Sequence, residues 1–261
     1  MQEFSRIWLE TLADIYENGA EVSPRSKLTR EILQRTIAID MRKPVLRVPR
    51  RQLSYKFMAA EAFWILSGDD TVAGIAPWNS RIADFSDDGE RFFGAYGPKI
   101  MGQLPAVLGR LLEDPVSRQA GLTIWRENPP NTKDVPCTVA IFFSIREGKL
   151  NLHVFMRSSD VWLGVPYDVF NFAMLGHYVC GALNELTGRH YISPGTLYLT
   201  AASSHLYEIN FEDVRACLHD ADWLEQPATP DELWQDNKVL LARLQDLRDV
   251  PASSPLRWWQ L

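Results

Sequence analysis

Twelve consecutive residues, Arg157 to Asp168, constrain the fold of this 261-residue chain more than any other stretch. They place an arginine, two aspartates and a Gly-x-Pro turn between a strand-like run that ends at Met156 and a mostly apolar run over 169–186. An apolar run of that length predicts a buried helix, and Gly188 provides its C-terminal stop. The chain is therefore expected to pack a strand beside a buried helix, with polar groups at their junction.

The rest of the chain predicts a mixed α/β protein. Apolar residues at helical spacing predict helices over 4–18, 53–67, 101–113, 209–219 and 231–248. Strand-like patterns cover 31–47, 121–125, 138–146, 150–156 and 191–200, with a hairpin turn over 147–149. Residues 76–99 are rich in Gly, Asp, Ser and Pro and predict a long loop, which is usually functional. Without a linker or a repeat, we expect one domain over 1–261.

Composition argues against several classes of function. A net charge of −6 and a pI near 5.4 disfavour a general binder of nucleic acids or anionic membranes. No run approaches the roughly 18 apolar residues of a membrane span, and the N-terminus does not resemble a secretory signal. The three cysteines form no CxxC pair or Cys/His cluster, so neither a disulfide framework nor a metal site is expected. A reducing, cytoplasmic setting fits these features.

The run from Arg157 to Asp168 resembles the nucleotide-binding signature of thymidylate synthases, Arg-Ser-x-Asp-x-x-Leu-Gly-x-Pro-Phe-Asn. The resemblance implies an α/β fold with a twisted mixed sheet flanked by helices. It also implies a homodimer in which each active site borrows an arginine. The match fails at the last residue, where Asp168 replaces asparagine.

That replacement changes what the site can bind. Uracil presents a donor, N3–H, and an acceptor, O4, which suit an amide, whereas cytosine presents the acceptor N3 and the donor N4–H2. A protonated Asp168 can donate to N3 and accept from N4–H2, and an ionised one can pair with a protonated N3. The resemblance therefore points to a cytosine nucleotide. The position of Asp168 before the buried helix also suits a helix N-cap. The sequence leaves both roles of Asp168, base reading and helix capping, open.

Cys137 lies in Val-Pro-Cys-Thr at the mouth of a predicted strand, 20 residues before Arg157. A free cysteine there is ordinarily a buried apolar residue. Thymidylate synthases have their nucleophile in Pro-Cys-His at about the same spacing, so the resemblance implies that Cys137 attacks C6 of the pyrimidine. Thr138 departs from that histidine. The attack needs a thiolate, and we expect the Arg157 guanidinium to lower the pKa of the thiol.

Three other segments resemble synthase segments in the same order. Glu61 corresponds to a glutamate that manages protons, which makes it the expected general acid or base; a solvated glutamate at a helix edge is the alternative. Tyr96 corresponds to a tyrosine near the reacting carbons, or it only packs the loop. Arg118 corresponds to an arginine that holds the phosphate of the partner subunit's nucleotide, or it lies in a surface turn. Gln119 replaces the second arginine of that segment.

The resemblance also assigns residues that hold the nucleotide phosphate. Arg157 and Ser158 belong to the signature itself. A third ligand is expected from the N-terminal part, where Arg25 is the first choice and Arg30 the alternative. An exposed surface arginine is the plain interpretation of either.

His205 and Tyr207 match a His-x-Tyr that contacts the sugar hydroxyl. Residues two apart in extended chain face the same side, so both can reach one ligand. Asp160 is expected to face the pterin of the folate, and Gly164 and Tyr96 complete the expected cofactor site.

Together these residues imply a homodimeric hydroxymethyltransferase that acts on dCMP with 5,10-methylenetetrahydrofolate. Cys137 adds to C6, C5 takes the one-carbon unit, and water completes the product while Glu61 and Asp168 handle protons. The last residues, 254–261, do not resemble the synthase tail that closes over folate, which favours water over hydride. A dCMP C5-methyltransferase, a CMP hydroxymethylase and an inactive relative that binds nucleotide or RNA are the alternatives.

Overall fold

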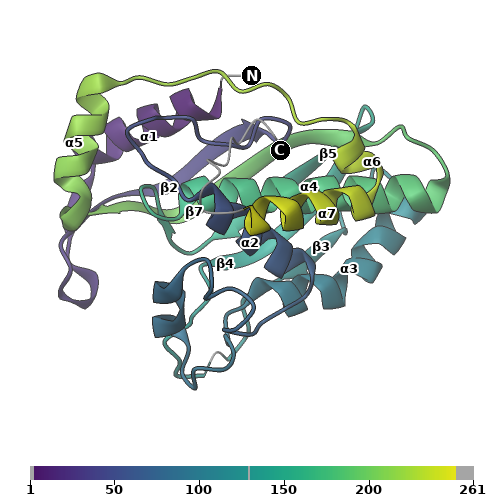
Figure 1. Ribbon diagram of the computed structural model, residues 1–261, viewed down its shortest axis with the longest axis horizontal. Helices are drawn as coiled ribbons and strands as arrows, with labels where there is room; N and C mark the ends of the chain where they lie inside the picture. The colour runs from purple at the N-terminus through teal and green to yellow at the C-terminus, as the bar shows by residue number, and fades with distance from the viewer. Residues whose placement is uncertain (1–2, 129, 251–261) are drawn as a thin grey trace.

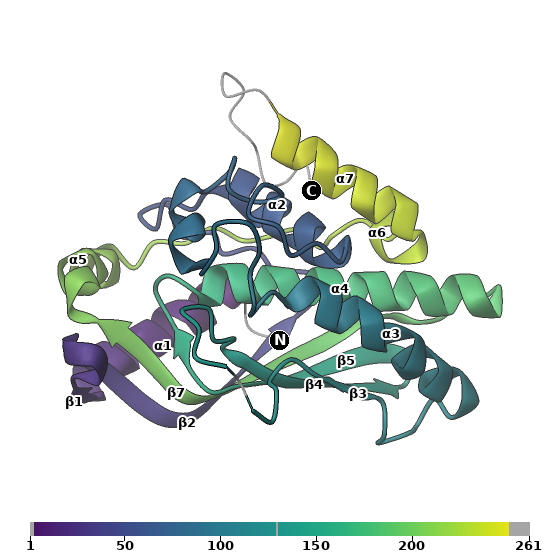
Figure 2. The same ribbon diagram turned by 90° about the horizontal axis from the view of Figure 1, so that it is seen from below.

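A mixed seven-stranded sheet forms one layer of the structure, and the helices lie over one of its faces (Figures 1 and 2). The computed structural model describes residues 3–128 and 130–250. The strand order is β1-β2-β7-β5-β4-β3, and the short β6 pairs with β7. The strands are β1 (Ala20–Val22), β2 (Thr29–Asp40), β3 (Gly121–Thr123), β4 (Thr138–Arg146), β5 (Lys149–Met156), β6 (Ser159–Asp160) and β7 (Ser193–Tyr207). The predicted α/β fold class is confirmed.

Most neighbouring strands run antiparallel, but β5 and β6 run parallel to β7. The β4–β5 hairpin turns at Glu147 and Gly148, which both have positive φ, 51° and 72°. Two consecutive residues of this kind make the tight turn whose twist matches that of the flanking strands. The parallel β5–β7 pair needs a long crossover, and this crossover contains β6 and the helix α4 (Val165–Thr187).

Helix α4 is the centre of the molecule, because it packs on the sheet with one side and on α2 (Tyr55–Leu66) and α7 (Asn237–Asp249) with the other (Figure 2). A helix covered on both sides must be apolar almost all round, which explains the long apolar run of the sequence. It ends at Gly188, which has the left-handed conformation with φ 64°. The prediction of a buried helix closed by Gly188 is confirmed.

The remaining helices flank this centre. Helix α1 (Phe4–Asn18) packs on β2 and β7, and α3 (Tyr96–Glu113) packs beside β3. α5 (Phe211–Asp220) and α6 (Glu232–Gln235) complete the set, together with short 3-10 turns η1 (Pro24–Ser26), η2 (Ser80–Phe85) and η3 (Glu208–Asn210). None of the helices within the described ranges is long and apolar enough to cross a membrane.

Several predicted boundaries were wrong. The loop expected over 76–99 stops at Tyr96, where α3 begins five residues before the predicted helix, and Pro105 is accommodated inside that helix. β2 ends at Asp40 rather than 47, and β7 continues to Tyr207 because β2 pairs with it as far as that residue. The helix expected over 231–248 is two helices, since Asp236 caps the start of α7 by accepting from the Lys238 N–H. The tail over 254–261 lies outside the described residues.

Candidate active site

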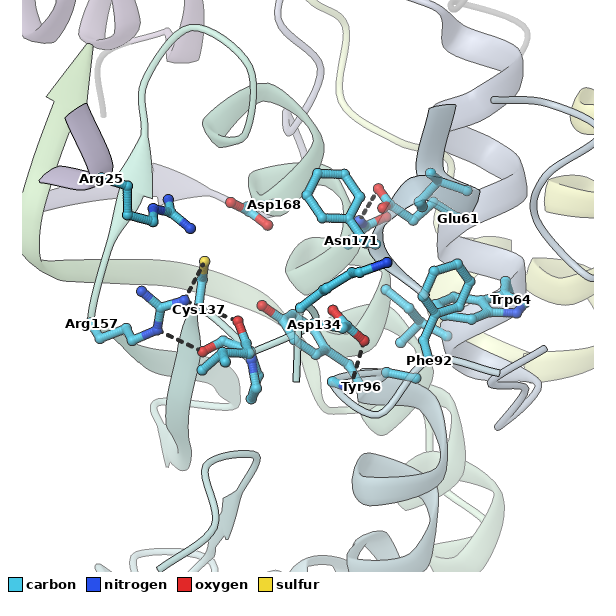
Figure 3. A pocket seen from close by; sticks show the side chains of 18 residues that line it. Arg25, Glu61, Trp64, Phe92, Tyr96, Asp134, Cys137, Arg157, Asp168 and Asn171 are labelled. Carbon is cyan, nitrogen blue, oxygen red and sulfur yellow. Dashed lines mark hydrogen bonds between the residues drawn. The ribbon is translucent and has the colours of Figure 1, made fainter. Parts of the chain in front are cut away.

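A cavity of about 300 Å³ lies where α2, α3 and α4 meet the start of β4, and we call it the inner cavity. It brings together Cys137, Glu61, Tyr96 and Asp168, which lie far apart in the sequence (Figure 3). Its apolar wall includes Trp64, whose ring packs edge-on against Phe92. The inner cavity therefore places a thiol and three carboxyl groups, those of Glu61, Asp134 and Asp168, beside an apolar wall.

Cys137 stands just before β4, and Arg157 holds the segment that carries it. The Arg157 guanidinium donates to the carbonyl oxygens of Pro136 at 3.0 Å and Val135 at 2.9 Å, and its Nη2 lies 3.7 Å from the Cys137 Sγ. The backbone N–H of Arg157 also donates to the Cys137 carbonyl at 2.8 Å. The two residues are thus fixed to each other by backbone and side chain (Figure 3).

The expected lowering of the Cys137 pKa is wrong for this chain by itself. Burial raises the pKa of the Cys137 thiol, and this outweighs the lowering by Arg157, the largest of the opposing effects. The carboxyls of Asp168 and Asp134 raise it further, while Arg25 lowers it. Sequence reasoning identified the guanidinium correctly but not the cost of removing a thiolate from water.

Glu61 points into the inner cavity from α2 and is not a solvated residue at a helix edge. Its Oε2 accepts a hydrogen bond of 2.7 Å from the Asn171 Nδ2. Burial raises the pKa of Glu61 to about 7, against the lowering by that hydrogen bond. A carboxyl group that titrates near neutral pH can both take and give a proton, which suits general acid and base work.

Asp168 lies in the first turn of α4, but it is not the N-cap of that helix. The N-cap is Gly164, so the capping interpretation is wrong. The Asp168 carboxyl accepts no hydrogen bond from the residues that the structure describes, and it faces the inner cavity. Burial, then the carboxyls of Glu61 and Asp160, raise the pKa of Asp168 to about 8. A neutral carboxyl group therefore faces the cavity at pH 7.

Tyr96 closes the inner cavity on the side of α3. Its hydroxyl accepts from the Thr138 N–H at 3.2 Å, and its ring stacks on Phe172 of α4 with centroids 6.4 Å apart. Burial is the main reason that the pKa of Tyr96 is raised far above its ordinary value. The tyrosine thus remains a neutral hydroxyl that ties α3 to the strand following Cys137.

A second cavity, the outer cavity, of about 540 Å³ opens beside the first and shares Arg25 and Arg157 with it. Ser158, His205 and Tyr207 also line it. The Ser158 Oγ lies 3.5 Å from the His205 Nδ1, and the rings of His205 and Tyr207 pack edge to face at 5.2 Å. Arg25, Arg157 and Lys133 bring three cations to this surface, and Glu31 brings one carboxylate, beside hydroxyl and imidazole groups.

The three arginines proposed besides Arg157 lie in different places. Arg25 has a left-handed backbone, with φ 53°, and its Nη2 donates to the Tyr207 hydroxyl at 3.5 Å. Arg30 instead pairs with Glu21 at 3.1 Å and donates to the Tyr16 carbonyl, so of the two arginines it is Arg25 that lines the outer cavity. Arg118 is exposed in the turn between α3 and β3 and lines neither cavity.

A third cavity, the side cleft, of about 700 Å³ extends from Cys137 past Asp160. The Asp160 Oδ1 accepts from the N–H groups of Trp162 at 2.9 Å and Leu163 at 2.8 Å. Burial raises the pKa of Asp160. Leu163 and Ile209, exposed by 51% and 87%, provide apolar surface along the same cleft.

Gly164 does not line the cavities named here, but it lies beside Asp160 and Asp168, which do. A Cβ atom on Gly164 would lie 3.1 Å from the Asp160 carbonyl oxygen and 3.2 Å from the Asp168 Oδ2. The glycine therefore leaves room for the Asp160 carbonyl oxygen and the Asp168 carboxyl beside this turn, and its backbone conformation, with φ −92°, is not unusual.

Sequence reasoning missed two polar groups of the inner cavity. Asn171 lies one turn beyond Asp168 on α4, and Asp134 accepts from the Gly94 N–H at 2.6 Å. The signal for Asn171 was available, because a polar residue three positions after Asp168 on a buried helix faces the same side. Asp134 had no such signal, since it lies in a loop.

The sequence was also compared with known protein families. Residues 6–233 match the thymidylate synthase family, and the chain belongs to this family. Proteins of the family use 5,10-methylenetetrahydrofolate as their one-carbon donor.

A deoxyuridylate hydroxymethyltransferase of Bacillus phage SP01 is similar to the chain, with 31% identity over 182 residues. The similar region is 61% of this chain and 47% of the phage protein. The chain thus spans about half the length of the curated relative that it matches.

Proposed function

We propose that this protein is a folate-dependent hydroxymethyltransferase that converts dCMP to 5-hydroxymethyl-dCMP. The observation that carries the proposal is Asp168, a carboxyl group that faces the inner cavity where the family signature has an amide. With its pKa raised to about 8, it brings a proton to the site at neutral pH. That proton can be shared with the N3 of cytosine, which has none of its own.

The inner cavity would hold the base. Addition of the Cys137 sulfur to C6 pushes electrons into the ring, and the Asp168 proton meets the charge that develops at N3. The pKa of the Cys137 thiol is raised in the chain alone although Arg157 and Arg25 lower it, so further positive charge near the sulfur would favour the thiolate that attacks C6. An Arg118 contributed by a second subunit is our candidate for that charge.

Glu61 would manage the protons at C5. Its pKa of about 7 leaves it partly ionised at neutral pH, so it can accept the C5 proton directly or through water. Once it has given that proton to the tetrahydrofolate nitrogen from which the one-carbon unit would break away, the regenerated carboxylate could take a proton from the water that adds to the one-carbon group. Loss of the sulfur from C6 restores the aromatic ring and frees Cys137.

The outer cavity would hold the sugar phosphate, with Arg25, Arg157 and Ser158 at the phosphate. His205 and Tyr207 would contact the sugar hydroxyl. Their edge-to-face pair and the bond from Arg25 to the Tyr207 hydroxyl keep sugar and phosphate ligands in one arrangement. We expect this part of the site to distinguish deoxyribose from ribose. It would therefore determine whether dCMP or the alternative, CMP, is the substrate.

The side cleft fits a folate, because it offers apolar surface at Leu163 and Ile209 and a carboxyl group at Asp160 that can accept from a pterin N–H. The bound 5,10-methylenetetrahydrofolate supplies the one-carbon unit for C5. Tyr96 and Gly164 support the walls between this cleft and the base rather than forming its surface.

The functional form would be a homodimer. The face of the sheet away from the helices carries exposed Phe142, Phe155 and Tyr198, and Leu33 is exposed by 66%. Phe142 and Phe155 pack edge to face at 6.3 Å, and His153 stacks on Tyr198 at 4.9 Å. A second copy of the chain would cover this apolar face and bring an Arg118 to each active site.

The free cysteines Cys137, Cys180 and Cys217 suit a cytoplasmic location. The acidic net charge of −6 gives no support for a nucleic-acid or membrane partner.

Hydroxymethylation of dUMP is a second candidate, which the phage deoxyuridylate hydroxymethyltransferase favours. Release of tritium from C5-labelled nucleotides separates the candidates. We expect folate-dependent release from dCMP, at least tenfold faster than from dUMP, and none with Cys137→Ser. Faster release from dUMP would show that dUMP, and not dCMP, is the substrate. No release from any pyrimidine nucleotide would favour an inactive relative that only binds nucleotide or RNA.

A further inference from the structure

Asn171 has a buried acceptor atom that the protein leaves unused. The residue lies on α4 one turn beyond Asp168 and is only 8% exposed. Its Nδ2 donates to the Glu61 Oε2 at 2.7 Å, while its Oδ1 accepts no hydrogen bond from the residues that the structure describes. Both Asn171 and Asp168 line the inner cavity, and Figure 3 places Asn171 between Asp168 and Glu61.

The hydrogen bond to an ionised Glu61 fixes which end of the amide is which. In that state the carboxylate can only accept, so it selects the NH2 end of Asn171 and leaves the Oδ1 for another partner. A buried carbonyl oxygen without a partner costs free energy. The cost is recovered when a ligand brings a hydrogen-bond donor to this point of the cavity.

The Asp168 proton suits the N3 of cytosine, but Asp168 by itself does not reject uracil. A neutral carboxyl group can donate to N3 and accept from N4–H2 of cytosine. With its proton on the other oxygen, it can equally accept from N3–H and donate to O4 of uracil. The site therefore needs a group whose role is not interchangeable, and an amide oxygen is an acceptor only.

We propose that Asn171 is a second base-reading residue, whose Oδ1 accepts a hydrogen bond from the exocyclic amino group of cytosine. This amino group has two hydrogens, and Asp168 uses the one beside N3. The other points toward C5, the side on which Glu61 is expected to work. Uracil would place O4 opposite the Asn171 Oδ1, so that two acceptors would face each other. The inference rests on the proposed function, since it assumes that the inner cavity holds the base.

The test is the affinity of the full-length protein for dCMP and dUMP, measured by titration calorimetry without folate. We expect the wild type to prefer dCMP. Asn171→Ala should reduce the ratio of the two affinities about tenfold or more, because dCMP loses a partner while dUMP loses a repulsion. Asn171→Ser should lower the ratio further, since a hydroxyl can donate to O4. It also provides a second variant if alanine prevents folding.

If Asn171 had a purely structural role, its replacement would lower the affinities for dCMP and dUMP by the same factor. The 2-pyrimidinone deoxynucleotide, which lacks the amino group, provides the matched control, and its affinity should be the same for the wild type and Asn171→Ala. An unchanged dCMP to dUMP ratio in both variants, with a wild type that prefers dCMP, overturns the role of Asn171 and leaves the proposed substrate intact. A wild type that prefers dUMP overturns the substrate itself, and the role of Asn171 with it.

Discussion

Replacing Asp168 by asparagine should change how the stability of the protein depends on pH. Burial and two neighbouring carboxyls raise the pKa of Asp168 from 3.8 to about 8. A carboxyl with a raised folded-state pKa stabilises the fold least when it is ionised, so stability falls as pH rises from the unfolded value to the folded value and is constant above it. Asp168→Asn removes this carboxyl group and should remove its contribution to the fall in stability with rising pH.

The magnitude follows from the pKa of about 8. Between pH 6 and pH 9 the unfolded chain keeps Asp168 ionised, while the folded chain loses its proton near the middle of the range. About two pKa units of the shift act in this window, which corresponds to roughly 3 kcal/mol at ~1.4 kcal/mol per unit. Water at the cavity and the coupling to Glu61 reduce this, so we expect about 1.5–3 kcal/mol.

Urea unfolding at pH 6, 7.5 and 9 measures the effect as the difference in free energy of unfolding between variant and wild type. That difference should move in favour of Asp168→Asn by the stated amount as pH rises. Asp246→Asn, on the exposed side of α7, is the matched control and should leave the wild-type pH dependence unchanged. A constant difference between Asp168→Asn and the wild type across the range would refute a proton held on Asp168.

Three further changes test other parts of the site. Cys137→Ser should abolish turnover and keep nucleotide affinity within a few-fold, because an alkoxide forms far less readily than a thiolate; turnover near the wild-type rate would exclude the nucleophile. Gly164→Ala should cost about 1–3 kcal/mol in urea unfolding, since its Cβ would lie 3.2 Å from the Asp168 Oδ2; unchanged stability and activity would show that this turn has room for a Cβ atom. Phe155→Glu should yield a monomer with little activity by light scattering and assay, whereas Leu186→Glu, at an exposed site on α4, should not; a dimeric Phe155→Glu protein would place the interface elsewhere.

The elements with a strong pattern could be predicted from the sequence. The β4–β5 hairpin and helix α4 lie where expected, since each combines a clear apolar pattern with a turn or stop residue. Boundaries set by contacts with distant parts of the chain were missed. β7 extends to Tyr207 because β2 pairs with it, and α3 begins early at Tyr96, whose hydroxyl accepts from the Thr138 N–H.

The site divides in the same way. The resemblance supplied Cys137, Arg157 and Glu61, and the structure brings all three to one region. The energetic balance could not be predicted, because the pKa of Cys137 depends on burial that only the folded chain reveals. The spacing of Asn171 from Asp168 could have placed it at the cavity, but its hydrogen bond to Glu61, 110 residues away in the sequence, is seen only in the folded chain.

The mass of the product tests the central claim most directly. The protein is incubated with 5,10-methylenetetrahydrofolate and dCMP, dUMP or CMP in turn, and each nucleotide is examined by mass spectrometry while the folate is followed by its absorbance. The account predicts that dCMP becomes heavier by one CH2O unit and that tetrahydrofolate is formed. A product from dUMP in preference to dCMP would contradict the cytosine assignment. A dCMP product heavier by only one CH2, formed together with dihydrofolate, would contradict the hydroxymethyl transfer and identify a methylase.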